Sequence, residues 1–199
     1  LDDAGLVGPD FCAVHLTYPQ PFDVDLLAER GARVCACPGT EMDLGDGFLP
    51  LDARDLTLCI GSDSQATIEP LAEARALELH ARALAGRRNV MVQGTGRHAL
   101  AERLLRIASS HGAAAIGHAG DGIEVGAQAD LVSIDLRRPE AAGVPPLEAA
   151  ALVATPSWVS DVWVAGDRVV IDGRHPQRDA IIAKALPFLP QTAELTHTG

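Results

Sequence analysis

The sequence predicts an α/β fold in which helices cover parallel strands. In the first half, short apolar segments typical of buried strands alternate with segments whose apolar residues recur at helical spacing. Polar residues follow the carboxyl ends of the predicted strands, where parallel α/β proteins place their functional groups. In the second half, turn-rich stretches separate strands with partial alternation. We therefore expect an α/β part followed by a small β part.

Strands and helices alternate regularly through the first half. The first helix is bounded by Asp23, a possible N-cap, and by Gly31, a typical stop residue, and Pro38-Gly39 closes the second strand. Both a closed parallel barrel and an open doubly wound sheet fit this order of elements. The predicted strands span residues 11–15, 33–37 and 56–60, and the predicted helices span residues 23–30, 69–85 and about 96–110.

The second half predicts a β module and a closing helix. Residues 120–126 are turn-rich, and Ala165-Gly166-Asp167 has the composition of a tight hairpin. From Pro187 onward the chain is rich in Pro and Thr, and we expect it to fray. The predicted strands span residues 129–135, 159–165 and 168–172, and the helix spans residues 179–186. We predict three parts, at residues 1–122, 123–175 and 176–199.

Composition limits the classes of partner. Of the 199 residues, 47% are hydrophobic, which is ordinary for a protein with a packed core. The net charge of −11 argues against a nucleic-acid partner, which would favour a basic face. No apolar run reaches about 18 residues, so no membrane partner is expected. The chain begins at Leu1 without a signal-peptide pattern, and we expect these residues to be part of a longer, cytoplasmic protein.

The four cysteines are expected to be buried free thiols, as is usual in a reducing cytoplasm. Each lies in an apolar, strand-like segment, and no second pair completes a zinc-finger pattern. We expect Cys35 and Cys37 to point to opposite faces of their strand. The cysteines are Cys12, Cys35, Cys37 and Cys59.

Asp63 is the first candidate functional residue. It follows the third predicted strand in the run Ile60-Gly61-Ser62-Asp63-Ser64. A carboxylate directly after a buried strand is costly unless a partner compensates its charge, and a divalent metal is one such partner. A carboxylate is a suitable ligand for Zn²⁺ or Fe²⁺ and can also accept a proton from water. The alternative is a helix cap, because Asp and Ser are favoured N-caps.

His15 is the second candidate, because it closes the first predicted strand. A histidine there could act as a general acid or electrophile, since its pKa lies near neutrality, or it could be a hydrogen-bonded structural residue. The sequence contains no His-x-His, His-Glu-x-x-His, Cys-x-x-Cys or Gly-x-Ser-x-Gly motif. The other histidines are expected at the surface or at helix ends, and they are His80, His98, His111, His118, His175 and His197.

In order, four segments of the chain resemble motifs of the amidohydrolase superfamily, in its branch of deaminases and chlorohydrolases. They are Val14-His15-Leu16-Thr17, Gly61-Ser62-Asp63-Ser64, residues 110–117 and residues 124–132. The resemblance implies the C-terminal portion of a (β/α)8 barrel, from its sixth to its eighth strand, and part of a small β-sandwich. It also implies one divalent metal, Zn²⁺ or Fe²⁺, with Asp63 as metal ligand and proton acceptor and His15 assisting the attack on the substrate.

Within this branch, residues 40–47 and 87–90 are similar to the formimidoylglutamate deiminases. This resemblance implies hydrolysis of N-formimino-L-glutamate to N-formyl-L-glutamate and ammonia. Two features depart from the family pattern. Tyr18 stands where a second histidine is usual, and the His-x-His pair, the fifth-strand histidine and the general-base glutamate have no counterpart among these residues. We therefore expect the 199 residues alone to be inactive and poor in metal.

Two other functions stay open. The chain could belong to another deaminase of the branch, of the guanine or aminohydrolase type, because most substrate contacts would lie in residues that this sequence does not contain. It could also be a truncated module that no longer catalyses. For the full-length enzyme we expect a small-molecule substrate and a homo-oligomer. An incomplete barrel exposes strand edges, so we expect these residues alone to oligomerise or aggregate.

Overall fold

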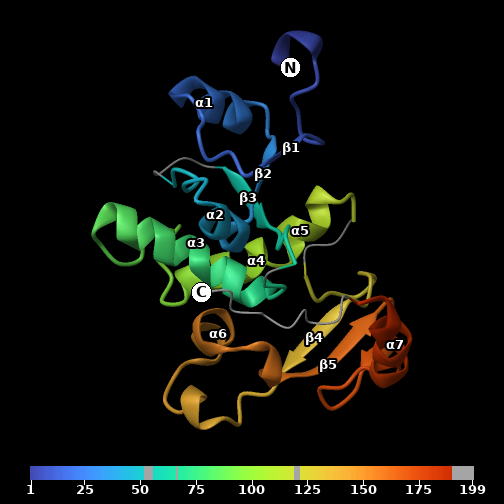
Figure 1. The fold of residues 1–199 in the computed structure, drawn as a ribbon. Helices are drawn as coiled ribbons and strands as arrows, with labels where there is room; N and C mark the ends of the chain where they lie inside the picture. The colour runs from blue at the N-terminus through green and yellow to red at the C-terminus, as the bar shows by residue number, and fades with distance from the viewer. Residues whose placement is uncertain (52–55, 66, 119–121, 190–199) are drawn as a thin grey trace, which may run out of the picture.

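Three short parallel strands form the first of two sheets (Figure 1). Their order β1-β2-β3 follows the chain, and the central strand β2 pairs with both neighbours. Parallel neighbours need a crossover connection, which gives each strand the same direction and brings all three carboxyl ends to one edge. The computed structural model describes residues 1–51, 56–65, 67–118 and 122–189. The strands are β1 (Cys12–Val14), β2 (Arg33–Ala36) and β3 (Thr57–Ile60).

Helix α1 (Pro21–Glu29) begins two residues before the predicted N-cap. Proline is favoured in the first helical turn, because its missing N–H needs no partner there. The main-chain N–H of Gln20 donates to Asp23 Oδ2 over 2.8 Å. Asp23 thus completes a capping box from inside the helix, and the predicted N-cap at this residue is wrong.

Helix α2 (Pro38–Leu44) is a second correction, because the sequence pattern assigned to Pro38-Gly39 only the end of a strand. Proline at the first helical position again starts the helix directly after β2. Gly45, in the left-handed conformation with φ 71°, ends it. The residues that follow β2 are therefore held in a helical turn.

The predicted helix over residues 96–110 is two helices, α4 (Ala99–Ile107) and α5 (Ser110–Ala115). The chain leaves helical geometry at Ser109, where φ is −132° and ψ is −94°. The Ser109 hydroxyl donates to the Leu105 carbonyl over 2.6 Å and so satisfies an acceptor at the end of α4.

One apolar core lies between the sheet and the helices α3 (Pro70–Ala85) and α4. Both helices contact β3. Their buried faces carry residues three or four positions apart, as the predicted helical spacing requires. The fully buried side chains in this core include Val34, Leu58, Leu77, Leu104 and Ile107.

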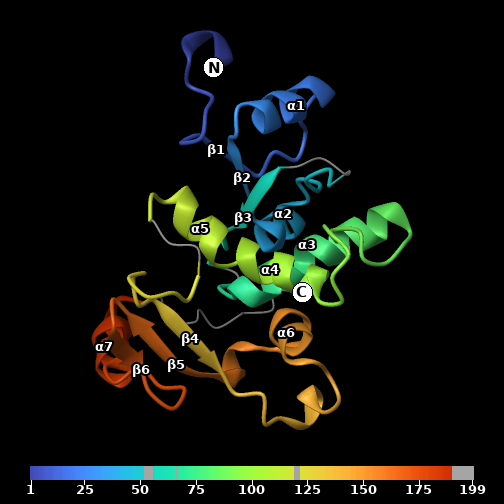
Figure 2. The same cartoon turned by 180° about the vertical axis from the view of Figure 1, so that it is seen from behind.

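A second, antiparallel sheet follows in the order β4-β5-β6 (Figure 2). The predicted hairpin between β5 and β6 is confirmed. Val164 pairs with Asp167 across Ala165 and Gly166, which both have positive φ, as the two-residue turns that match strand twist require. The elements are β4 (Leu131–Ile134), β5 (Val159–Val164), β6 (Asp167–Val170) and the closing helix α7 (Arg178–Ala185).

Helical turns that the sequence pattern did not predict connect β4 to β5. Helix α6 (Pro146–Glu148) continues into a π-helical segment (Ala149–Val153), which contacts both α3 and α4. Arg75 on α3 donates to the Ala154 carbonyl over 2.6 Å, and His98 Nδ1 lies 2.7 Å from Glu148 Oε1. These polar contacts attach the second half to the first. The single 3₁₀ turns are Asp2–Ala4, Pro139–Ala141, Pro156–Trp158 and Leu186–Phe188.

Across the described ranges, no helix combines the length and the apolar character that a membrane crossing would need. Residues 190–199, which include most of the predicted fraying tail and His197, lie outside the described residues.

A buried carboxylate fixes the loop after α3. Glu78 is fully buried, and its oxygens accept the main-chain N–H groups of Val90 over 3.2 Å and of Met91 over 2.9 Å. Arg82, one helical turn further along α3, donates Nε to Glu78 Oε1 over 2.6 Å. The carboxylate therefore satisfies three donors that would otherwise lack partners.

Replacing Glu78 with leucine should lower the free energy of unfolding by about 3 kcal/mol, because buried donors would lose their acceptor. Urea denaturation of the purified protein measures the change. The matched control is Glu102→Leu at an exposed position of α4, which should change stability by less than about 0.5 kcal/mol. Equal losses in the two variants would contradict this role of Glu78.

Candidate active site

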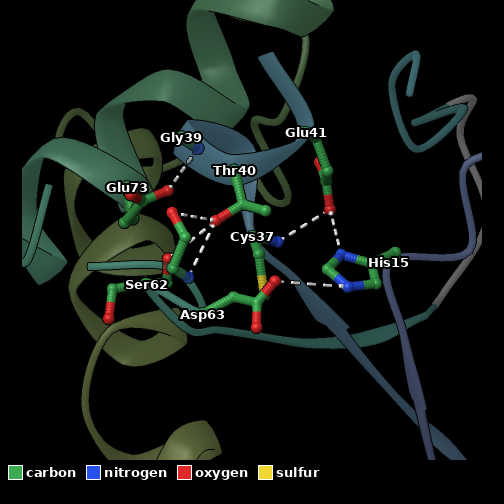
Figure 3. A network of polar contacts seen from close by, with 9 residues as sticks. His15, Cys37, Gly39, Thr40, Glu41, Ser62, Asp63 and Glu73 are labelled. Carbon is green, nitrogen blue, oxygen red and sulfur yellow. Dashed lines mark hydrogen bonds and ion pairs between the residues drawn. The ribbon is translucent and has the colours of Figure 1, made fainter. Parts of the chain in front are cut away.

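The candidate site lies at the carboxyl edge of the first sheet (Figure 3). His15 directly follows β1, and Asp63 lies three residues beyond the end of β3. The N–H of His15 donates to the Cys35 carbonyl over 2.8 Å, and the N–H of Gly61 donates to the Ala36 carbonyl over 3.0 Å. These bonds extend the β-ladder to the edge, so that residues far apart in the sequence meet there.

The two predicted site residues face each other. His15 Nε2 lies 3.6 Å from Asp63 Oδ2. The side chain of His15 is 39% exposed and that of Asp63 is 48% exposed, so both are accessible to a small molecule from solvent. The structure thus brings together the residues that the sequence singled out, and Asp63 lies in the turn before α3 without capping that helix, whose N-cap is Glu69.

Left-handed backbone marks both strand exits. His15, Leu16 and Asp63 have φ values of 66°, 50° and 51°. This region is uncommon for residues other than glycine, and it persists only where surrounding contacts enforce it. Such conformations concentrate at functional sites, and these two exits are also where the candidate residues stand.

Glu41 is the site residue that sequence reasoning missed. Its side chain is 2% exposed, and its Oε1 lies 3.4 Å from His15 Nδ1. The same oxygen accepts the main-chain N–H of Cys37 over 2.8 Å. The sequence placed Glu41 only within residues 40–47, a segment similar to one group of deaminases, and gave it no role. The helical turn of α2 directs the Glu41 side chain toward His15.

Thr40, 3% exposed, binds the turn that carries Asp63. Its Oγ1 lies 3.0 Å from the Ser62 carbonyl oxygen, 3.0 Å from Ser64 Oγ and 3.0 Å from the main-chain N of Ser64. These contacts lie on both sides of Asp63. Residues that follow the central strand therefore contact both outer strand exits (Figure 3).

The thiols of Cys35 and Cys37 are not arranged as the sequence predicted. Side chains two positions apart on a strand share a face, and a Cβ built at Gly61 would lie 3.5 Å from the Sγ atoms of both Cys35 and Cys37. The expectation of opposite faces is wrong for that reason. All four thiols are free as predicted, but only Cys37 and Cys59 are buried, whereas Cys12 and Cys35 are partly exposed.

These thiols are held in the neutral form. The hydrogen bond with Cys35 and burial raise the pKa of Cys37. For Cys35, the hydrogen bond with Cys37 acts to lower the pKa, but the bond with Cys59 and burial raise it to about 12. Since metals bind the thiolate, these cysteines are poor metal ligands near neutral pH.

The donors at the edge fit part of a metal centre. Asp63 offers carboxylate oxygens and His15 offers a ring nitrogen, both of which Zn²⁺ accepts. Within residues 1–51, 56–65, 67–118 and 122–189, no group of three or more His, Cys, Asp or Glu side chains is placed to hold a metal ion. Catalytic zinc sites usually take three protein ligands, so the described residues would supply only some of them.

The expectation for the other histidines is partly wrong. The His80 ring packs on Phe48 with centroids 4.0 Å apart, and burial lowers its pKa. His111 Nδ1 lies 2.8 Å from the Leu58 carbonyl oxygen, which ties α5 to β3. Both are partly buried packing residues, whereas His118 is exposed as expected.

The model of the amidohydrolase family matches residues 1–169. The chain belongs to the amidohydrolase family. It is 34% identical over 171 residues to a formimidoylglutamate deiminase of Pseudomonas aeruginosa, covering 83% of this chain and 38% of that protein. It is 32% identical over 176 residues to a 5-methylthioadenosine/S-adenosylhomocysteine deaminase of Teredinibacter turnerae, covering 85% of this chain and 39% of that protein.

Solved structures of this amidohydrolase group share the fold. An adenosine deaminase from Xanthomonas campestris with bound zinc superposes with a TM-score of 0.80 and 32% identity, over 94% of this chain and 43% of that one. An amidohydrolase from Brucella melitensis gives 0.79 and 35%, over 92% and 42%. The predicted superfamily is confirmed, and the chain spans less than half the length of these relatives.

Glu73 is a further buried carboxylate, and it binds the start of α2 next to the site. Glu73 on α3 is buried, and its Oε2 accepts the N–H of Gly39 over 2.7 Å. A Cβ at Gly39 would fall 2.4 Å from Glu73 Oε1, so a larger residue in this turn of α2 would require the Glu73 carboxylate to shift. Burial raises the pKa of Glu73 above its ordinary value of 4.5, although the Gly39 bond acts in the opposite direction.

Glu73→Gln should stabilise the protein at pH 7 and lose this advantage as the pH falls toward about 4.5. A raised pKa in the folded state means that the folded protein binds the proton more tightly than the unfolded chain does. The ionised form therefore costs stability above the raised pKa, and this cost disappears in acid. Urea denaturation at several pH values measures the difference, with the exposed Glu29→Gln as control. A difference that is constant with pH would contradict the prediction.

Proposed function

We propose that this chain is the C-terminal part of a metal-dependent hydrolytic deaminase that converts N-formimino-L-glutamate to N-formyl-L-glutamate and ammonia. The observation that carries the proposal is the facing pair of His15 and Asp63 at the carboxyl edge of a parallel sheet, 3.6 Å apart and open to solvent. Enzymes with a (β/α)8 barrel have their active sites at the carboxyl ends of the barrel strands. The three parallel strands would then be the sixth to eighth strands of such a barrel.

The substrate assignment rests on two supports. One is the 34% identity to the deiminase of Pseudomonas aeruginosa over 83% of this chain. The other is the similarity of residues 40–47 to that enzyme group, a segment that includes Thr40 and Glu41 beside the site. The residues that would recognise the glutamate moiety are expected in the remainder of the full-length protein.

The reaction adds water to the formimino carbon and releases ammonia. A bound divalent cation, Zn²⁺ or Fe²⁺, would supply Lewis acidity and make water a stronger nucleophile near neutral pH. Asp63 would hold the cation through one carboxylate oxygen and take a proton from the attacking water. His15 Nε2, which lies 3.6 Å from Asp63 Oδ2, would orient that water by a hydrogen bond. The proton taken up by Asp63 would then pass to the imino nitrogen, and the proton of the newly added hydroxyl would follow it to the same nitrogen as the carbonyl forms and ammonia leaves.

A second candidate is deamination of 5-methylthioadenosine or S-adenosylhomocysteine. It is favoured by the 32% identity to the Teredinibacter turnerae enzyme over 85% of this chain. Both reactions replace an amino or imino nitrogen by oxygen at a carbon between two nitrogens, so the same His15–Asp63 pair would serve either. The substrates differ in charge, because N-formimino-L-glutamate carries two carboxylates and the nucleosides carry a neutral purine.

A substrate comparison tests the proposal. The full-length polypeptide that contains these residues, loaded with Zn²⁺, is assayed for ammonia release from N-formimino-L-glutamate, 5-methylthioadenosine, S-adenosylhomocysteine and guanine. The proposal expects kcat/KM to be highest for N-formimino-L-glutamate. Preference for a purine substrate would assign the chain to another deaminase, and release from none of the four would favour a module that does not catalyse.

Asp63→Asn should lower kcat/KM and the affinity for Zn²⁺ by at least about 100-fold each, because losing a direct ligand should cost more than losing a residue that only orients one. Asparagine also tolerates the left-handed backbone at this position, so the fold should persist. Metal content by mass spectrometry and the ammonia assay provide the readouts. The control, Asp10→Asn, is exposed and precedes β1 at the opposite edge. Full zinc content in Asp63→Asn would refute the ligand role.

A further inference from the structure

We propose that Thr40 and Glu41, consecutive residues on α2, are positioning residues, Thr40 for Asp63 and Glu41 for His15. The inference rests on the proposed function, because it assigns these residues to the same site. The central strand β2 leads directly into α2, so the residues of its first turns emerge between the exits of β1 and β3. From there one short helix reaches both candidate site residues (Figure 3).

The Thr40 hydroxyl has one proton to donate and two lone pairs to accept. All three contacts are 3.0 Å long. The single hydroxyl proton can be donated to the Ser62 carbonyl or to Ser64 Oγ, and the oxygen accepts the main-chain N–H of Ser64. Because Thr40 is 3% exposed, water does not compete for these bonds.

These bonds lie on both sides of a residue with left-handed backbone conformation. Asp63 has a φ of 51°, and Thr40 holds the residue before it and the residue after it. A left-handed residue persists when its surroundings enforce it. Thr40 therefore fixes the direction in which the Asp63 carboxylate leaves the main chain, without itself reaching the reacting atoms.

Glu41 acts on His15 in a different way. Its Oε1 is fixed by the N–H of Cys37 at 2.8 Å, and the side chain is almost fully buried. A carboxylate accepts hydrogen bonds but does not donate them, so the 3.4 Å contact with His15 Nδ1 favours the tautomer that carries its proton on Nδ1. In that tautomer the unprotonated Nε2 faces Asp63. A neutral His15 then offers Nε2 as an acceptor to a water molecule.

A purely structural role is the competing explanation, because Glu41 also stabilises the start of α2 and Thr40 also ties α2 to the turn after β3. The two explanations differ in their consequences. A structural role predicts that substitution lowers stability and leaves the affinity for metal and the tautomer of His15 unchanged. A positioning role predicts specific losses that a conservative variant restores.

The Thr40 arm uses Zn²⁺ itself as the probe, in the full-length polypeptide. Thr40→Val keeps the shape and removes the hydroxyl, and it should weaken Zn²⁺ binding about 10-fold, as is usual for residues that orient a ligand. Thr40→Ser should stay within about 2-fold of the wild type. The matched control, Thr57→Val, is exposed at the opposite end of β3 and should change nothing. Competition with a chelator measures the affinity.

Unchanged Zn²⁺ affinity in Thr40→Val would overturn the Thr40 assignment, and so would an equal loss in Thr40→Val and Thr40→Ser. If Thr40→Val does not fold, Thr40→Ala replaces it with the same criteria. This arm needs no substrate, so it decides the inference even when none of the tested compounds is deaminated. Failure of the proposed function and failure of the Thr40 assignment therefore remain distinguishable.

The second experiment tests the role of Glu41 by observing which nitrogen of the His15 ring carries the proton. Nitrogen NMR of the ¹⁵N-histidine-labelled wild type, recorded at a pH where the His15 ring is uncharged, should show its proton on Nδ1. Glu41→Gln keeps an acceptor oxygen and should preserve this tautomer, whereas Glu41→Leu should lose it and lower kcat by about 10-fold with little change in KM. A wild-type proton on Nε2 would overturn the Glu41 assignment whether or not Glu41→Leu folds.

Discussion

The parallel pairing of β1, β2 and β3 is the constraint on which the site depends. Because the three strands run in one direction, their carboxyl ends share one edge of the sheet. His15 and Asp63 therefore face each other there, although they are 48 positions apart in the sequence. The central strand has a special place in this arrangement. Whatever follows β2 lies between the two outer exits, and in this chain it is a short helix that carries polar side chains to both sides.

Buried carboxylates with main-chain partners recur through the α/β part. Glu41, Glu73 and Glu78 are all buried, and each accepts at least one main-chain N–H, from Cys37, from Gly39, and from Val90 and Met91. Such a group fixes a turn that apolar packing alone would leave free to rotate, at the cost of removing the carboxylate from water. Buried carboxylates that accept main-chain N–H groups thus stabilise the residues beside the site, the start of α2 and the loop that follows α3.

The sequence predicted the parts of this structure that are encoded locally. Apolar segments and helical spacing located the strands and the long helix α3, and the order of polar residues at strand ends pointed to His15 and Asp63. Glu41 was not identified as a site residue because it lies 26 positions from His15 in the sequence. The contact also depends on helix α2, whose first residues, Pro38-Gly39, were interpreted as the end of a strand. The shared face of Cys35 and Cys37 was misjudged, although strand geometry alone determines it. The domain limits, the closed barrel and the β-sandwich stay predictions, because they concern parts that no local pattern fixes.

The left-handed turn at residue 63 also shapes which amino acids this position can hold. Glycine, asparagine and aspartate adopt such a φ at little cost, whereas β-branched side chains do so rarely. A complete substitution scan of position 63 should therefore separate into two nested sets. The larger set of tolerated residues reflects the geometry of the main chain, and the smaller set within it, which retains a carboxylate, reflects the chemistry of the site.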